Sequence, residues 1–304
     1  MSFRKLASHV LLLAATAFAA AAWAQEGQGD VVYVPTPQVA VDEMLKLAKV
    51  GPNDFVIDLG SGDGRIIITA AKKLGARGFG VDLDTYLLKV ANAAAQKEGV
   101  ADRAQFVEQN LFETDLSKAT VITTYLLPEM NERLRPKLLA LKPGTRVVAH
   151  DYDMGEWTPD EQKTLIVPEK KVGDPGKSYV FFWVVPARIA GTWQSQISVA
   201  GKPVAYEFTL AQEFQMLDGS GRAGNQSGVV KGRMAGTQVR FTLSGKAGDG
   251  LLRHEFQGRV TGDDAIEGVV HVGEGAKRQQ YPWTAKRTQR AAAVSGALAR
   301  NALP

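Results

Sequence analysis

Hydrophobic and polar positions divide the chain into two stretches with different periods. From residue 38 to 186, short apolar runs alternate with helical stripes, such as the one on which Val41, Met44 and Leu45 share a face. From Arg188 onward the helical period disappears, and apolar residues alternate with polar ones between glycine-containing turns. The two patterns predict an α/β domain followed by an all-β domain.

The first stretch predicts a mainly parallel, doubly wound sheet with helices on both faces, because strands and helices alternate along it. Two further apolar runs, 164–167 and 179–185, flank Gly173-Asp174-Pro175-Gly176 and predict a closing hairpin. The other expected strands are 55–59, 78–81, 105–108, 121–126 and 146–150, and the expected helices are 38–50, 65–74, 85–98 and 129–141.

The second stretch predicts a small antiparallel barrel or sandwich, because its alternating runs are short and regularly separated by turns. Gly191-Thr192-Trp193 is similar to the G-x-W opening of lipocalin-like barrels, over these three residues alone. Residues 288–304 show no clear pattern, and we expect a frayed tail there. The expected strands are 192–199, 204–210, 228–234, 237–243, 254–260, 265–272 and 279–285.

Residues 1–24 have the pattern of a secretory signal peptide. Arg4 and Lys5 precede the uncharged apolar run 10–22, and Ala22-Trp23-Ala24 fits a small-x-small cleavage site. We therefore expect a periplasmic or secreted protein; the alternative is an uncleaved N-terminal anchor in the inner membrane. The predicted organisation is a signal peptide (1–24), an α/β domain (25–186), an all-β domain (187–287) and a tail (288–304).

Charge is distributed unevenly between the two predicted domains. The chain has 36 Lys and Arg against 32 Asp and Glu; residues 25–186 carry 19 basic and 23 acidic side chains, and residues 187–304 carry 15 and 9. Solvated faces of a small β domain explain the basic half most simply, and weak contact with an anionic membrane surface is the alternative. Cysteine is absent, which excludes disulfides, cysteine-based metal sites and thiol catalysis.

The glycine-rich segment Asp58-Leu59-Gly60-Ser61-Gly62-Asp63-Gly64 lies between a predicted buried strand and a helix. Its glycines permit tight turns and close approach of main-chain amides to a ligand. The dinucleotide-binding spacing G-x-G-x-x-G fails, because its third glycine would fall at Arg65. A carboxylate at the strand end favours a ligand with a cationic amino-acid end over a diphosphate.

The segment VIDLGSGDGR resembles motif I of the class I, seven-strand S-adenosylmethionine-dependent methyltransferases, and the resemblance covers residues 33–186. It implies that Asp82 hydrogen-bonds the ribose hydroxyls and that Asn110 accepts from the adenine amine of S-adenosylmethionine. It also implies a seven-stranded sheet whose last hairpin, Thr164–Val185, inserts an antiparallel strand. The implied cofactor-binding residues are Thr36, Asp58, Gly60, Ser61, Gly62, Gly64, Asp82, Leu83, Asn110 and Leu111.

Two further segments narrow the resemblance. Tyr33-Val34-Pro35-Thr36-Pro37 and Tyr125-Leu126-Leu127-Pro128 are similar to the lysine methyltransferases that act on mitochondrial membrane carriers and on the ATP synthase c-ring protein. The resemblance implies a protein lysine or another amine as methyl acceptor.

The catalytic candidates are Tyr125, Glu129 and Asp151, which follow predicted strands at the edge where open α/β sheets bind ligands. Methyl transfer depends mainly on aligning the nucleophile, and an amine acceptor must be neutral. Tyr125 would shape the methyl-transfer channel and Glu129 would receive the amine. Asp151 belongs to the cluster His150-Asp151-Tyr152-Asp153, which is a poor metal site because no distant ligand completes it.

The sequence therefore predicts an exported methyltransferase that modifies a protein amine or a small envelope metabolite. The alternative is a non-catalytic module that keeps the fold in order to bind a ligand or a partner. We expect no nucleic-acid partner and no metal. The methyl acceptor, the general base and the oligomeric state leave no pattern in the sequence.

Overall fold

The computed structural model describes residues 32–291 apart from 248–249, 274 and 276–277. The expected signal peptide and most of the expected tail lie outside these residues. The described residues up to Arg135, with Arg146–Trp183, form one compact unit, and Pro136–Thr145 with the residues from Val184 onward form a second. Of the helices described, none has both the length and the apolar character needed to cross a membrane.

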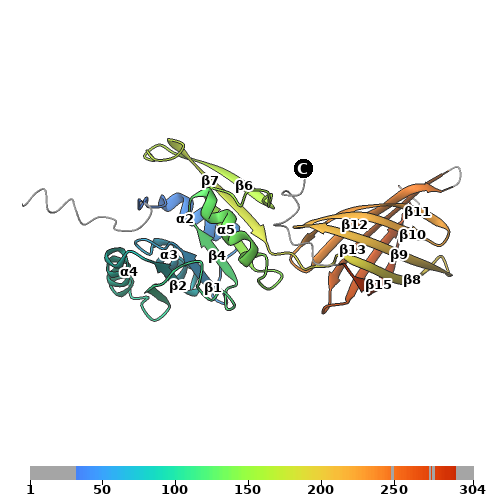
Figure 1. The fold of residues 1–304 in the computed structure, drawn as a ribbon, viewed down its shortest axis with the longest axis horizontal. Coiled ribbons are helices and arrows are strands. Elements are labelled where there is room, and N and C mark those ends of the chain that lie inside the picture. Colours follow the sequence, from blue (N-terminus) through green and yellow to red (C-terminus); the bar gives the residue numbers. More distant parts are fainter. Residues whose placement is uncertain (1–31, 248–249, 274, 276–277, 292–304) are drawn as a thin grey trace, which may run out of the picture. The chain divides into compact units, whose positions relative to one another are not determined.

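The first unit is built on a seven-stranded sheet in the order β3-β2-β1-β4-β5-β7-β6 (Figure 1), which confirms the predicted fold class. Strands β1, β2, β3, β4 and β5 pair in parallel, and β6 and β7 form the expected antiparallel hairpin. The strands are β1 (Phe55–Leu59), β2 (Arg77–Asp82), β3 (Ala104–Glu108), β4 (Val121–Thr124), β5 (Arg146–His150), β6 (Glu161–Val167) and β7 (Gly176–Val184).

Four helices accompany these strands, namely α2 (Gln38–Leu47), α3 (Arg65–Leu74), α4 (Thr85–Lys97) and α5 (Pro128–Leu138). Helix α2 ends three residues before the predicted boundary, because Lys49 adopts a left-handed conformation (φ 50°) ahead of Gly51-Pro52. Helix α4 begins at an N-cap in which the Asp84 carboxylate accepts from the amides of Tyr86 and Leu87. This cap fixes the start of α4, directly after the end of β2.

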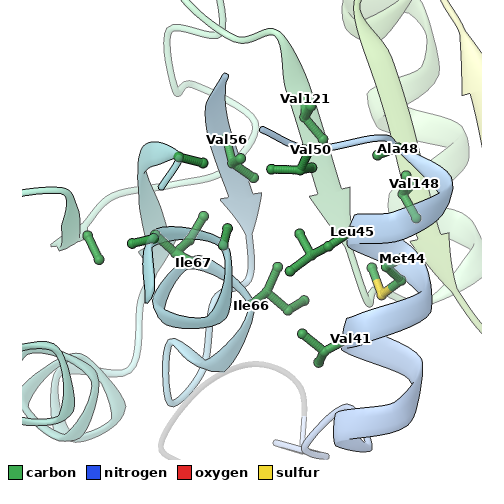
Figure 2. Close-up of a cluster of buried hydrophobic side chains, with 14 of the residues drawn as sticks. Val41, Met44, Leu45, Ala48, Val50, Val56, Ile66, Ile67, Val121 and Val148 are labelled. Carbon is green, nitrogen blue, oxygen red and sulfur yellow. The ribbon is translucent and has the colours of Figure 1, made fainter. Parts of the chain in front are cut away.

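The apolar stripe predicted on α2 is buried. Figure 2 shows Val41, Met44 and Leu45 of α2 beside Ile66 of α3, with Val56 of β1 at the same cluster. Met44 is 0% exposed and Leu45 is 2% exposed. Burial of such side chains contributes about 1.5–3 kcal/mol each, so this cluster anchors α2 and α3 to the strands whose ends carry the site.

The second unit contains a closed barrel in the order β10-β11-β12-β13-β14-β15-β8-β9, which settles the choice between barrel and sandwich. Its strands are β8 (Gly191–Val199), β9 (Lys202–Glu213), β10 (Met216–Ala223), β11 (Gln226–Ala235), β12 (Gln238–Ala247), β13 (Gly250–Val260), β14 (Ala265–Val272) and β15 (Gln279–Arg290). The inward side chains include large aromatic ones, and the rings of Phe241 and Phe256 stack with centroids 4.7 Å apart.

Two expectations for the barrel were wrong. Strand β10 was missed, because Gly219 and Gly221 gave the sequence the character of a turn; a Cβ at Gly219 would lie 2.0 Å from the carbonyl oxygen of Thr209. Strand β15 also runs to Arg290, past the expected strand end at residue 285. These additional residues pair with β8, and the guanidinium of Arg290 binds the carboxylate of Asp264, just before β14, at 2.9 Å.

Candidate functional site

A cavity of about 290 Å³ opens at the carboxyl ends of β1, β2, β3 and β4. Strand β1 pairs with β2 on one side and with β4 on the other, so the cavity lies where the strand order reverses. This is the position at which open α/β sheets bind ligands. The lining residues are Val32–Thr36, Asp58, Gly60, Ser61, Asp63, Arg65, Ile66, Asp82–Asp84, Leu87, Gln109–Phe112, Tyr125, Leu126, Met130 and Arg133.

The loop between β1 and α3 forms one wall of the cavity, and its conformation requires glycine. Gly60, Gly62 and Gly64 have φ values of 80°, 52° and 80°. A Cβ at Gly62 would lie 2.4 Å from the Tyr33 ring, and one at Gly64 would lie 2.5 Å from the Phe106 ring. Gly62 and Gly64 therefore shape the wall without being among the residues that line the cavity.

Asp58 stands at the base of this wall and is 2% exposed. Its Oδ1 accepts a hydrogen bond of 2.7 Å from the Thr123 hydroxyl on β4. Burial, reinforced by the nearby carboxylates of Asp82 and Asp63, raises the pKa of Asp58 to about 7. A cationic group in the cavity would favour the ionised form of this carboxyl.

Asp82 ends β2 and faces the same cavity. Its two carboxylate oxygens are oriented by main-chain donors: Oδ2 accepts from the Gly62 amide at 2.9 Å and Oδ1 from the Asp84 amide at 3.0 Å. Each oxygen keeps a further lone pair, so the carboxylate can accept from a pair of vicinal hydroxyls. The structure thus brings Asp58 and Asp82 together from adjacent strands.

The segment after β3 forms the opposite wall, with Asn110, Leu111 and Phe112. Asn110 Oδ1 accepts from the Phe112 amide at 3.0 Å, which orients the side chain that the sequence assigned to the adenine amine. The Arg133 guanidinium of α5 lies 3.8 Å from the centre of the Phe112 ring, a cation–π contact. Sequence reasoning missed Arg133, because nothing in the sequence indicates which face of α5 meets the cavity.

The segment before α2 closes another side of the cavity. Arg65 Nη1 donates to the carbonyl oxygen of Thr36 at 2.8 Å, and its Nη2 binds Asp63 Oδ2 at 2.6 Å. The fork between Arg65 and Asp63 therefore ties residues 32–36 to the glycine loop. Thr36, expected to contact the cofactor, is buried and lines the cavity.

Tyr125 follows β4, lines the cavity and links it to the segment after β5. Its hydroxyl donates to Asp151 Oδ2 at 3.1 Å, and Lys170 Nζ binds the same oxygen at 2.6 Å. Asp151 does not itself line the cavity. Lys170 comes from the turn between β6 and β7 and was not expected from the sequence.

The remaining candidates lie farther from the cavity. Glu129 is exposed in the first turn of α5 and is not among the lining residues. His150 is buried against Ser178, with Nε2 and Oγ 3.0 Å apart, and burial lowers its pKa to about 4. Asp153 Oδ1 accepts from the amide of Gly155 at 3.0 Å. In the described part of the chain, no three His, Asp or Glu side chains gather as a metal site would require.

Buried polar atoms among the lining residues indicate a polar ligand. Ser61 Oγ and Asp84 Oδ2 are buried and have no hydrogen-bond partner among the described residues. Buried polar atoms in folded proteins are nearly always hydrogen-bonded. Together with the paired acids Asp58 and Asp82, they fit a ligand that carries both a cationic end and hydroxyl groups.

The comparisons with known proteins agree with this geometry. The family model named ANTKMT methyltransferase domain matches residues 58–161. A protein-lysine N-methyltransferase of Saccharolobus islandicus is 50% identical over 133 residues, which cover 43% of this chain and 83% of that protein. An adenine nucleotide translocase lysine N-methyltransferase of Mus musculus is 32% identical over 132 residues, which cover 43% of this chain and 57% of that protein.

A solved structure is also similar. The RNA methyltransferase from Salinibacter ruber, crystallised in complex with S-adenosyl-L-homocysteine, is 48% identical; the match covers 51% of this chain and 96% of that one, with a TM-score of 0.46. The match to the Mus musculus protein spans little more than half of that protein's length. The match to the Saccharolobus protein spans most of its length at 50% identity. The chain therefore belongs to the class I S-adenosylmethionine-dependent methyltransferases, in one family with the protein-lysine N-methyltransferase of Saccharolobus islandicus.

Proposed function

We propose that this methyltransferase modifies the side-chain amine of a protein lysine. The observation that carries the proposal is the position of Tyr125. Its side chain lines the cavity that suits the cofactor, and its hydroxyl is hydrogen-bonded to the buried carboxylate of Asp151. The relatives from Saccharolobus islandicus and Mus musculus are both named as lysine N-methyltransferases, which supports an amine acceptor.

Different cavity residues contact different parts of the cofactor. Asp82 accepts from the ribose hydroxyls, and Asp58 faces the cationic amino-acid end with a carboxyl that ionises when a positive charge approaches. Ser61 and Asn110 offer further polar contacts, and Leu83 and Leu111 supply apolar surface for the adenine ring. When bound, S-adenosylmethionine supplies an electrophilic methyl group, so these residues mainly determine its direction.

The acceptor amine must present a lone pair to that methyl group, and therefore reacts as the neutral form. The Tyr125 hydroxyl donates a hydrogen bond to Asp151, so its oxygen can still accept a hydrogen bond from the amine. Burial raises the pKa of Tyr125 well above its ordinary value, and the adjacent Asp151 raises it further. Tyr125 accordingly orients the amine and does not act as a base.

Charge favours a protein acceptor over a nucleic acid. Residues 25–186, which contain the cavity, carry 23 acidic against 19 basic side chains. A net negative surface repels a phosphate backbone, whereas nucleic-acid-binding domains usually present a basic face. The same charge attracts a lysine on a basic partner.

The test is methylation of a whole extract with methyl-labelled S-adenosylmethionine and the full chain. Protein and RNA fractions are separated, and the labelled protein is hydrolysed to identify the modified amino acid. We expect methyllysine in protein, and no label with the Asp82→Ala variant. Label confined to RNA, to arginine or to small metabolites would contradict the proposal.

We also propose that residues 1–24 direct export. The support is the charged start, apolar run and small-x-small site in the sequence. The acceptor is then a protein of the cell envelope.

A further inference from the structure

A buried ion pair lies just behind the cavity. Lys170 Nζ is 2.6 Å from Asp151 Oδ2, and the two side chains are 4% and 5% exposed. Buried ion pairs are costly unless their geometry is good and their other hydrogen bonds are satisfied. Because the pair lies beside the cavity, we followed its contacts toward the residues that line it.

The surroundings of the pair hold both partners in place. Lys170 Nζ also donates to the carbonyl oxygen of Lys177 at 2.5 Å, and Asp151 Oδ1 accepts from the Tyr179 amide at 3.1 Å. The turn between β6 and β7 covers the pair, since a Cβ at Gly173 would lie 3.5 Å from Asp151 Oδ2. Asp151 adopts a left-handed conformation (φ 61°), which costs energy in a residue with a side chain.

The same carboxylate oxygen receives the Tyr125 hydroxyl. Tyr125 lines the cavity, and its ring packs on His150 with centroids 4.1 Å apart. The ring fixes the position of Tyr125, and the bond to Asp151 fixes the direction of its hydroxyl proton. A carboxylate held by Lys170 thus decides where the free lone pairs of the Tyr125 oxygen point.

We propose that Lys170 is a positioning residue for methyl transfer: by holding Asp151, it sets the orientation of the Tyr125 hydroxyl that faces the acceptor amine. The amine in this statement rests on the proposed function. Lys170 is not among the residues that line the cavity. Lys170 therefore acts through Tyr125, and replacing it should change the rate of methyl transfer and leave the cofactor affinity unchanged.

The variant Lys170→Met removes the charge and keeps a side chain of similar length. Lys170→Arg keeps the charge, and Lys170→Gln keeps a hydrogen-bond donor if the methionine variant does not fold. Lys171→Met is the matched control, because Lys171 is the exposed neighbour in the same turn and its Nζ contacts only the Pro168 carbonyl among the partners described.

The first measurement does not depend on catalysis. The chain has 7 tyrosines, so ring-labelled tyrosine gives a resolvable NMR spectrum in which Tyr125→Phe assigns the Tyr125 signals. We expect Lys170→Met to shift the Tyr125 signals, Lys170→Arg to restore them in large part, and Lys171→Met to leave them unchanged. Unshifted Tyr125 signals in a folded Lys170→Met protein would overturn the proposal, whatever the activity of the enzyme.

The second measurement is kinetic and uses the lysine acceptor. We expect Lys170→Met to lower kcat by about ten- to hundredfold, since small misplacements of reacting groups have effects of that size. The Kd for S-adenosylhomocysteine should stay unchanged. In the Tyr125→Phe background the same substitution should change kcat no further, because the two residues act through one group.

The outcomes separate the two proposals. Additive effects of Lys170→Met and Tyr125→Phe, or an equal loss of cofactor affinity, would show a merely structural role and reject the inference. Shifted Tyr125 signals in an enzyme that methylates no lysine would retain the positioning of Tyr125 and reject the proposed function.

Discussion

The Arg287 guanidinium lies over the Trp193 ring, 4.7 Å from its centre. Trp193 is 1% exposed on β8, and Arg287 sits on β15, the strand that pairs with β8 to complete the barrel. Arg287 Nη2 also donates to the carbonyl oxygens of Arg188 and Asp263, each at 2.8 Å. One side chain thus joins the first and last strands of the barrel and two loops beside them.

Replacing Arg287 should destabilise the barrel. Arg287→Ala removes the cation–π contact and the hydrogen bonds to main-chain carbonyls, which together contribute about 2–4 kcal/mol. Chemical denaturation followed by tryptophan fluorescence measures the loss. Arg290→Ala is the control, because Arg290 makes exposed ion pairs and such pairs contribute about 1 kcal/mol or less. Equal losses for the two variants would show that the Trp193 contact has no special weight.

Gly62→Ala should weaken cofactor binding. The new Cβ would lie 2.4 Å from the Tyr33 ring, at a residue whose φ is 52°. The loop must move, and the Gly62 amide that orients Asp82 moves with it. Titration calorimetry with S-adenosylhomocysteine measures the loss, which we expect to exceed about tenfold in Kd, as a cost of about 1.4 kcal/mol implies. Gly51→Ala is the control, since a Cβ there meets nothing within 4 Å; equal affinity of Gly62→Ala and the parent would refute the account of the loop.

Asp58 should make the stability of the cofactor-free protein depend on pH. Its pKa is about 7 when folded, against 3.8 for a free carboxyl, so the folded state binds the additional proton between these values. The contribution of protonated Asp58 to the free energy of unfolding is therefore fully present below about pH 4. It is lost as pH rises through about 7, and the loss is on the order of 4 kcal/mol at most. Denaturation between pH 4 and 8 tests this. Asp58→Asn should flatten that part of the profile, and an unchanged slope would assign it to another group.

Export predicts a defined mature terminus. N-terminal sequencing of protein from fractionated cells should begin at Gln25, after Ala22-Trp23-Ala24. An intact Met1 in the membrane fraction would support an uncleaved anchor. An intact Met1 in the cytoplasmic fraction would contradict both alternatives.

The features that could be read from the sequence are local ones. The glycine loop, the acid at the end of each of β1 and β2, and the hairpin of β6 and β7 each lie within a few consecutive residues. Their turn and strand signals therefore survive in a single stretch of chain. The loop and both acids meet at one cavity because parallel strands carry their carboxyl ends to the same edge of the sheet.

The features that were missed depend on rotation and on distant contacts. Asn131 of α5 donates to the carbonyl oxygens of Tyr152 and Asp153, each at 3.1 Å, and these two bonds hold one face of the helix against the segment after β5. Arg133 then lines the cavity and Glu129 does not. Lys170 pairs with Asp151 only because β7 lies beside β5 in the sheet, which brings the turn between β6 and β7 to the end of β5, and no periodicity records that approach.

The glycine loop after β1 is held tightly against β2 by hydrogen bonds and close packing. The amides of Gly60 and Ser61 both donate to the Val81 carbonyl oxygen at 2.9 Å, and a Cβ at Gly80 would lie 2.3 Å from Ser61 Cβ. This wall of the cavity is therefore preorganised, and a ligand that binds there loses little binding free energy to ordering the loop. The close contact also restricts substitution in β2. Gly80 does not line the cavity, but a methyl group added there would displace Ser61, which does.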